Sequence, residues 1–564
     1  MNDASTLTWE PPGPGTWTLD LAHVPKPLTP FWAELYTEPS GRGFTDTTPR
    51  YGTFLDKVDI RFSNGLMYSQ PVPVGGGGGG GLPPKWLFTV LLKVHPALRQ
   101  RIKSAATVYD RKPWRDDLRE WEDEVKPAVI AKSKKLQAVD VASLSTDELL
   151  THLDICRDHL IDSVYYHHYF DLAALAPLAD FLAHAVEWTN LGLAELFPLM
   201  KGATEESTGT SPELKRLLTE LSKNPEIVAR LASPDVSPTE KVEALLSAEG
   251  EVGQAARDYY ELVGHRVGDG YDIDSPTVGE MPEVLIRCVL SRLDSSGPEA
   301  PALDAIAASV RERVPEEHRE EFDALLAEAR GTYGLRDQRG LYTDIWASGI
   351  TRKAVLELGR RLAAEGKLEA PEHLMEANYE EMVALGKNEG GPSGAELAQR
   401  ARARATLDVS KAPFRLGPEM GPPPPVEWFP PELQRSLKAQ NVVIETMFSE
   451  HESQRSGQTI SGLAVQRGVY EGTARIISGP QEFGRIVEGD VLVTRSTSAA
   501  FNIILPLLGG LVTERGGLLS HAAIVAREYG IPAVVSCQEA TMTIADGARV
   551  RVDGDAGEVT ILQS

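Results

Sequence analysis

The sequence predicts a multidomain protein in which a large, mainly α-helical domain (residues 1–411) precedes a C-terminal α/β domain (residues 461–564). Three observations support this fold class. Between about residues 85 and 400, apolar residues recur at helical spacing, whereas from residue 461 onward short β-rich runs alternate with turns. A proline-rich connector, residues 412–460, separates the two patterns.

Composition excludes several classes of protein. With 42% hydrophobic and 24% charged residues, the chain is too apolar to be disordered, and its formal net charge of −24 disfavours nucleic acid and membrane partners. The three cysteines, Cys156, Cys288 and Cys537, are scattered and predict a reducing compartment without a metal site. The N-terminus has no secretory signal, and residues 503–512 are too short to span a membrane. We therefore expect a soluble, cytoplasmic protein.

The first 90 residues predict two strand-like pieces, residues 58–62 and 66–68, which are separated by a turn at residues 63–65. Seven consecutive glycines, residues 75–81, follow this region. Because such a run has high conformational entropy and leads into Pro83 and Pro84, we expect a flexible loop rather than a phosphate-binding one.

The helical part has clear start signals. Ser145 and Glu148 form the pattern of a capping box, which predicts a long helix that begins after Ser145. Its buried face follows 3.6-residue spacing through Leu149, Leu153, Cys156, Leu160 and Val164. Further helices are expected over residues 211–222, 239–247, 252–263, 301–314, 315–333 and 351–365.

The connector begins with a semi-rigid, proline-rich stretch, residues 412–431, and continues as a short helix from about residue 432 to 450. No strong amphipathic pattern attaches it to either domain. We therefore expect the connector to act as a swivel.

The C-terminal domain is predicted to combine short strands with two helices, at about residues 498–507 and 519–529. The expected strands lie at residues 469, 474–477, 491–494, 510–513, 533–535, 549–552 and 558–561.

The segment from Thr513 to His521 carries the strongest chemical signal. A strand ends at Thr513, Gly516 and Gly517 permit a tight loop, and His521 lies in the first turn of the next helix. Backbone N–H groups and the positive end of the helix would stabilise an anion on His521. A neutral imidazole is a competent nucleophile toward phosphorus. We therefore expect His521 to be catalytic, and Thr513, Gly516, Gly517 and Ser520 to bind its phosphate.

Residues 513–532 resemble the phosphohistidine motif of the phosphoenolpyruvate-utilising, or swivelling-domain, superfamily. The resemblance implies that residues 461–564 form a swivelling phosphohistidine domain, which an ATP-grasp domain phosphorylates and which then delivers the phosphoryl group to an acceptor domain. Too few residues follow His521 for the phosphoenolpyruvate-binding barrel, and residues 1–430 show no ATP-grasp pattern. We therefore expect a separate ATP-grasp nucleotide-binding subunit to bind ATP and Mg²⁺, with no metal bound by this chain.

Residues 1–411 more weakly resemble the acceptor domain of the rifampicin phosphotransferases. The matching segments are Trp17–His23, Gly264–Arg266, Leu335–Arg339 and Leu358–Leu362. The resemblance implies that His265, Arg266 and Arg336 contact substrate. The family's Arg-Glu-x-x-Lys pattern is only partly kept, because Asp337 replaces the glutamate and Gly340 the lysine, so Arg339 is a candidate to supply the missing positive charge.

His167 and His168 lie in an aromatic run, residues 165–170, that could line a pocket for a ring-bearing substrate. His167 also falls on the buried face of the helix that begins after Ser145. It is therefore a candidate either for a general base or for a core histidine. Likewise, His265 and Arg266 could be a structural pair at a helix terminus, and Arg336 could be a solvated charge.

Together these patterns indicate a subunit of an ATP-dependent, dikinase-type phosphotransferase. His521 would carry a phosphoryl group to the hydroxyl of a small organic acceptor, while the ATP-grasp partner forms AMP and phosphate. The separate-subunit arrangement resembles that of the phenylphosphate synthases, which favours a phenol or alkylphenol and a role in aromatic catabolism. The alternative is a relay phosphocarrier that passes its phosphoryl group to another protein.

Overall fold

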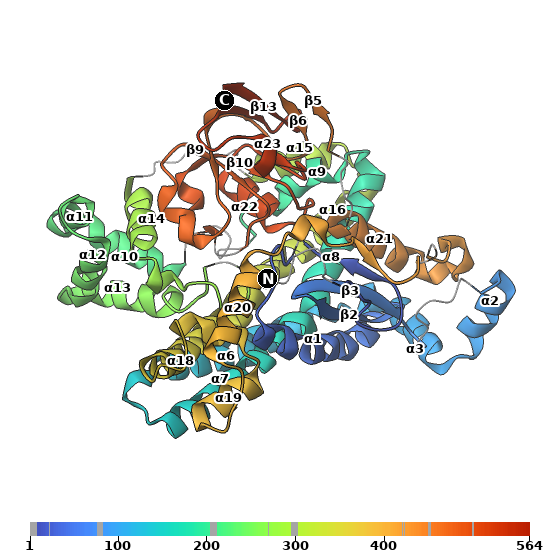
Figure 1. The fold of residues 1–564 in the computed structure, drawn as a ribbon. Helices are drawn as coiled ribbons and strands as arrows, with labels where there is room; N and C mark the ends of the chain where they lie inside the picture. Colours follow the sequence, from blue (N-terminus) through green and yellow to red (C-terminus); the bar gives the residue numbers. More distant parts are fainter. Residues whose placement is uncertain are drawn as a thin grey trace. The chain divides into compact units, whose positions relative to one another are not determined.

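The structure is a computed structural model that describes residues 8–21, 23–75, 83–203, 211–268, 270–294, 303–419, 421, 423–448, 453–498, 501–502 and 504–563. The chain forms two compact, discontinuous units (Figure 1). The first consists of Met1–Ala176, Tyr271–Asp274 and Arg339–Lys438, and the second of Pro177–Gly270, Ser275–Gln338 and Ala439–Ser564. Three helices run from one unit into the other: α8 (Asp171–Thr189), α17 (Leu335–Tyr342) and α21 (Gln434–Phe448).

The first unit is built on three long helices. Helices α1 (Pro30–Tyr51) and α18 (Asp344–Ala364) pack against α7 (Thr146–Tyr169), and their apolar side chains share one core. The capping box of Ser145 and Glu148 is present, which confirms the predicted start of α7. The other helices are α2 (Lys85–Val94), α3 (Pro96–Ala105), α4 (Val108–Arg111), α5 (Trp114–Glu120), α6 (Lys126–Gln137), α19 (Tyr379–Lys387) and α20 (Gly394–Ala405).

An antiparallel sheet in the order β2-β3-β1-β4 completes the first unit. Its strands are β1 (Trp17–Leu19), β2 (Leu55–Ser63), β3 (Leu66–Pro73) and β4 (Arg415–Leu416). Asn64 and Gly65 both have positive φ, as a two-residue hairpin turn between β2 and β3 requires. The predicted strand pair is therefore confirmed, whereas most of the glycine run lies outside the described residues.

The second unit contains the remaining predicted helices, which cover residues close to those expected. They are α10 (Pro212–Ser222), α12 (Pro238–Ser247), α13 (Gly250–Val263), α15 (Leu303–Glu312) and α16 (Arg319–Tyr333), together with α9 (Leu193–Leu196), α11 (Pro225–Ala232) and α14 (Pro282–Asp294). Leu217, Leu221 and Leu231 are fully buried where α10 and α11 meet the other helices of this group.

The C-terminal part of the second unit is a nine-stranded sheet in the order β5-β6-β13-β12-β8-β9-β10-β11-β7. Strands β8 to β11 run parallel, and the others pair antiparallel. The strands are β5 (Arg455–Ser456), β6 (Thr459–Ser461), β7 (Leu463–Gln466), β8 (Val469–Ile476), β9 (Asp490–Thr494), β10 (Leu508–Thr513), β11 (Ala533–Val535), β12 (Arg549–Asp553) and β13 (Glu558–Gln563). The sheet thus begins inside the segment expected to be connector.

One predicted helix of this region is wrong. The described part of residues 498–507 forms only short turns, which end in the 3₁₀ turn Leu505–Leu507, and Pro506 lacks the N–H that a helix through this segment would need. The other helix is present as α22 (His521–Tyr529).

The expectation that neither domain holds the connector is also wrong. Leu433 and Leu437 are buried in the first unit beside Ala105, and the ring of Phe429 lies 5.0 Å from that of Phe54. These apolar contacts hold residues 429–437 of the connector against the first unit. Thr446, farther along α21, is buried in the second unit.

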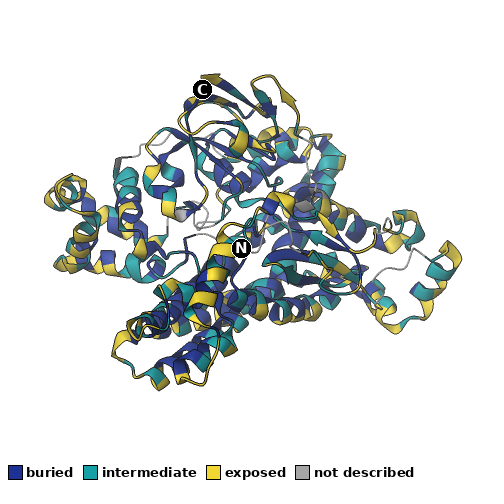
Figure 2. Ribbon diagram, in the orientation of Figure 1, coloured by how far each residue is buried: buried dark blue, intermediate teal, exposed yellow. Residues whose placement is uncertain are grey.

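Many helices bury one face and expose the other, as their amphipathic sequence patterns predict (Figure 2). Helices α7 and α8 form one apolar stretch, Thr146–Thr189, that is long enough to cross a membrane, but 61% of its most apolar window is buried inside the protein. This stretch is weak evidence for a membrane span, since core helices share its properties.

The three cysteine thiols are buried, and burial raises the pKa of each to about 12.

Candidate functional site

The turn between β10 and α22 places His521 at the first position of the helix. The Ser520 hydroxyl accepts a hydrogen bond from the N–H of Ala523 at 3.3 Å and so caps α22. The buried Thr513 hydroxyl donates to the carbonyl of Arg515 at 2.8 Å. Both hydroxyls expected to bind phosphate therefore stabilise the turn in this structure.

The two glycines of the turn are required for different reasons. Gly516 has a φ of +126°, and a Cβ there would lie 2.8 Å from the Ser520 hydroxyl. A Cβ on Gly517 would collide with the carbonyl oxygen of Thr446 in α21. Gly516 thus permits the backbone conformation of the turn, whereas Gly517 permits α21 to approach it.

Both nitrogens of the half-buried His521 ring have hydrogen-bond partners. Nδ1 lies 2.9 Å from the hydroxyl of Thr497, and Nε2 lies 2.9 Å from Oδ1 of Asn502. Because the amide oxygen can only accept, this arrangement places the ring proton on Nε2 and leaves Nδ1 to accept from the hydroxyl. A phosphoryl group on either nitrogen would displace one of these two partners.

The sequence analysis did not identify Thr497 or Asn502. The strand order could nevertheless have pointed to Thr497. Strands β9 and β10 are adjacent and parallel, and the segments that follow such strands meet at one edge of the sheet. Thr497 comes shortly after the end of β9, as His521 comes after the end of β10.

Two guanidinium groups hold consecutive carbonyls of the turn. Arg336 of α17 donates to the carbonyl of Leu519, and Arg527 of α22 donates to that of Leu518 at 2.6 Å. Burial and, to a smaller extent, the charge of Arg336 lower the pKa of His521 to about 3. The ring is therefore neutral at physiological pH and keeps a lone pair for nucleophilic attack.

His167, His168 and Arg339 lie together in the first unit. Arg339 donates to the backbone carbonyl of His167 and pairs with Asp171 at 2.8 Å. Nδ1 of His167 lies 2.9 Å from Oδ2 of Asp344.

His168 is a core residue. Its Nε2 lies 2.7 Å from the hydroxyl of Tyr36, and its ring packs beside Phe44. Burial is the main cause that lowers its pKa well below the ordinary value. Asp344, Asp171 and Tyr36 were not identified from the sequence, because no local spacing connects them with the two histidines.

His265 and Arg266 belong to the second unit, in the turn that follows α13. The N–H of Arg266 donates to the carbonyl of Val263 at 3.1 Å, and its own carbonyl accepts from the N–H of Val278 at 2.9 Å. The backbone of this pair thus closes a tight turn onto the 3₁₀ turn Val278–Glu280. This geometry agrees with a structural role at a helix terminus.

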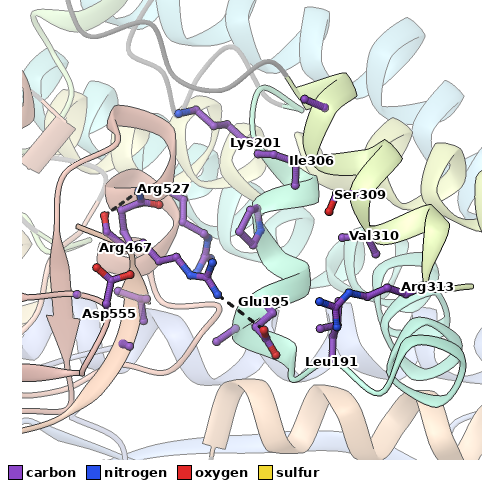
Figure 3. Close-up of a pocket in the computed structure, with 17 residues that line it drawn as sticks. Leu191, Glu195, Lys201, Ile306, Ser309, Val310, Arg313, Arg467, Arg527 and Asp555 are labelled. Carbon is purple, nitrogen blue, oxygen red and sulfur yellow. Dashed lines mark hydrogen bonds and ion pairs between the residues drawn. The ribbon is translucent and has the colours of Figure 1, made fainter.

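A pocket of about 630 Å³ opens in the second unit, between α9, α15 and the loops beside β7 and β12 (Figure 3). Arg467 and Glu195 face each other across it at 3.7 Å. Its other charged lining residues are Lys201, Arg313, Arg527 and Asp555. Neither His521 nor any residue expected to bind the acceptor lines this pocket.

We predict that Gly516→Ala slows phosphorylation of His521 by roughly 10²-fold, because the new Cβ displaces the Ser520 cap and shifts the imidazole. Gly530→Ala is the matched control: Gly530 also has positive φ (+69°), at the other end of α22, but a Cβ there meets no atom within 4 Å. Acid-labile phosphate on the chain is the measurement. Equal rates in the two variants would contradict the role of the cap.

We predict that His521 stays unprotonated as the pH falls through 6.5, its ordinary pKa, toward about 3. Between about pH 5 and 8, ¹⁵N NMR should therefore show constant ring shifts for this residue. Arg336→Gln removes one cause of the shift and should raise the pKa. Titration of His521 near 6.5 in the unsubstituted protein would contradict the prediction.

Comparison with known proteins identifies two segments. Residues 486–557 match the family model for the PEP-utilising enzyme mobile domain, and residues 172–339 match that for the rifampicin phosphotransferase fourth domain. Among solved structures, aconitase X of Thermococcus kodakaraensis aligns with 19% of this chain and 100% of its own chain, at 21% identity and a TM-score of 0.17.

Several curated relatives are phosphotransferases. A rifampicin phosphotransferase of Streptomyces sp is 30% identical over 55% of this chain and 35% of its own length. The rifampicin phosphotransferase of Bacillus cereus is 45% identical over 19% of this chain and 12% of its own length. The uncharacterised phosphotransferase YvkC of Bacillus subtilis is 28% identical over 43% of this chain and 27% of its own length. The matches thus span less than half of these relatives. Residues 172–339 are thus similar to the rifampicin phosphotransferase fourth domain, and residues 486–557 to the mobile domain of PEP-utilising enzymes.

Proposed function

We propose that this protein is a phosphotransferase that carries a phosphoryl group on His521 and delivers it to the hydroxyl of a small organic acceptor. The observation that carries the proposal is the neutral imidazole of His521 at the N-terminus of α22, oriented by Thr497 and Asn502 within a mobile-domain segment. The helix terminus and the guanidinium of Arg336 would both stabilise negative charge on this ring.

The donor in this proposal is ATP bound to an ATP-grasp nucleotide-binding subunit, with AMP and phosphate as the other products. Mg²⁺ would neutralise the nucleotide phosphates on that subunit. The relatives named as phosphotransferases support phosphoryl chemistry in general. The choice of partner rests on the resemblance of residues 513–532 to the phosphohistidine motif.

The acceptor in this proposal is a phenol or alkylphenol. The Tyr271 ring lies 5.8 Å from that of His167 in an edge-to-face arrangement, and the Trp32 ring lies 6.3 Å from Tyr271 and stacks on Tyr36 at 4.4 Å. Such surroundings favour a ring-bearing molecule over an aliphatic one. Arg339 adds a positive charge beside this cluster, to which the product phosphate would be attracted.

In the transfer step, the acceptor oxygen would attack the phosphorus atom of phosphorylated His521. The P–N bond breaks as the P–O bond forms, the electron pair of the broken bond returns to the ring nitrogen, and the hydroxyl proton of the acceptor is released to water. The low proton affinity of the His521 ring makes this nitrogen a good leaving group in its neutral form.

His521→Ala should abolish both the acid-labile phosphate and the phosphorylated product, because the ring is the only carrier in this scheme. His184→Ala is the control, since the recorded contacts of His184 are with Asp180 and Trp188 of its own helix. The assay combines the protein, an ATP-grasp partner, ATP, Mg²⁺ and a panel of phenols, and follows the product by ³¹P NMR. Product formation by the His521→Ala variant would overturn the proposal.

Without the ATP-grasp protein, we expect the chain to form no AMP from ATP and to take no phosphate from phosphoenolpyruvate. The proposal assigns the ATP site to another polypeptide and contains no site for phosphoenolpyruvate. Chromatographic measurement of AMP, with and without the partner, tests this expectation. AMP formation by the purified chain alone would place a nucleotide site among its helices.

A further inference from the structure

The pocket in the second unit has the size and the lining of a small-molecule site, yet the proposed transfer does not use it (Figure 3). Its volume of about 630 Å³ lies within the roughly 300–1,000 Å³ that such sites occupy. Its apolar lining residues include Pro198 after α9, Ile306 and Val310 of α15, and Val465 of β7. A ligand would therefore bury an apolar body here.

The guanidinium group of Arg527 lines this pocket with one nitrogen unsatisfied. Only 4% of Arg527 is exposed. Its Nη2 donates to the carbonyl of Leu518 at 2.6 Å, its Cζ lies 4.7 Å from the centre of the Phe197 ring, and the Tyr333 hydroxyl interacts with it. Its Nη1 is buried and has no hydrogen-bond partner among the described residues. Because a buried cationic N–H without an acceptor is costly, an oxygen of an anionic ligand would stabilise it.

Lys201 supplies a second positive charge to the same pocket. It is half-buried, and burial is the main cause that lowers the pKa of its ammonium group. In the described part of the chain, neither Lys201 nor Arg527 forms an ion pair. The charge of Glu528 acts on both cations, but the two oxygens of this carboxylate accept the N–H of Gly202. Both cations are thus available to a negatively charged ligand.

The other charged lining residues of the pocket are exposed. Arg467 and Glu195 form an ion pair at 3.7 Å, and the carboxylate of Asp555 accepts the N–H of Gly468 at 3.2 Å. Arg313 adds a further exposed cation. Four cations and two carboxylates line the pocket, so its charge balance is positive, although the whole chain has a formal net charge of −24. This local excess of positive charge favours an anion.

We propose that this pocket binds a small organic anion, an apolar body that carries one carboxylate, sulfonate or phosphate group. The anionic group accepts a hydrogen bond from Nη1 of Arg527 and pairs with Lys201, while the apolar body lies against α15 and β7. An inorganic anion fits less well, because it would leave the apolar lining in contact with water. The inference concerns binding alone and does not depend on the proposed phosphotransfer.

The test is a fluorescence titration of the full chain with 8-anilinonaphthalene-1-sulfonate, an apolar ring system with one anionic group. The comparison probes are N-phenyl-1-naphthylamine, which has the same ring system without the sulfonate, and inorganic phosphate. We expect saturable binding of one sulfonate probe per chain. The neutral probe should bind more weakly by roughly tenfold or more, because it makes no charged hydrogen bond. Inorganic phosphate at the same concentration should not displace the sulfonate probe.

Variants locate the binding in this pocket. Ala305→Trp should weaken binding of both naphthalene probes by roughly tenfold or more, because Ala305 lines the pocket and the indole would fill part of it. Ala308→Trp is the matched control, since Ala308 is another exposed alanine of α15 but is not among the lining residues. Lys201→Gln should weaken the sulfonate probe by roughly tenfold and leave the neutral probe unchanged. Arg527 is left in place, because it also holds the carbonyl of Leu518.

Thermal unfolding provides a second measurement. A ligand that binds only the folded chain stabilises it, so saturating sulfonate probe should raise the Tm of the unsubstituted protein and of Ala308→Trp, but not that of Ala305→Trp. Circular dichroism without probe checks that both tryptophan variants are folded. No saturable binding of the sulfonate probe, equal affinity in the two tryptophan variants, or equal affinity for the two naphthalene probes would overturn the inference. Displacement by inorganic phosphate at the same concentration would overturn the proposed class of ligand.

Discussion

The turn that carries His521 depends on two guanidinium groups that hold its backbone. Arg336 and Arg527 donate to the adjacent carbonyls of Leu519 and Leu518, and they come from different helices. The positive charge of Arg336 opposes protonation of His521 and would attract a phosphoryl group on the same ring. The charge of Arg336 thus disfavours protonation of the His521 ring and would favour a phosphoryl group on it. A phosphoryl carrier needs this selectivity.

The first unit shows a different use of charge. Its inserted segment Tyr271–Asp274 is held by ion pairs, because Asp274 contacts Arg404 at 2.6 Å and Lys26 at 3.2 Å. Asp272 accepts from the N–H and hydroxyl of Thr29, and burial raises the pKa of this carboxyl group to about 6. These buried contacts attach a segment that is distant in sequence to the N-terminus of α1.

Local sequence signals predicted α7, several helices of the second unit and most strands, but failed where tertiary contacts decide the conformation. The sequence did not predict α1, which contains Pro39 and Pro49, because internal prolines remove backbone hydrogen bonds. Packing explains this helix: a Cβ on Gly43 would lie 2.7 Å from the carbonyl oxygen of Tyr165, so the glycine permits close contact with α7. For the site, His521 and its cap were readable from consecutive residues. Asn502 and Asp344 were not, because only the fold brings each of them to a histidine.

The burial of all three native thiols has a practical consequence for measuring motion. Thiolates are the reactive form of cysteine, and a pKa of about 12 makes them rare at neutral pH. Cysteines introduced at exposed positions, such as Trp86 in α2 and Met542 in the short helix α23 (Ala540–Thr543), would therefore react with maleimide dyes far faster than the native ones. Fluorescence energy transfer between two such dyes can then follow the distance between the two units without removal of any native cysteine.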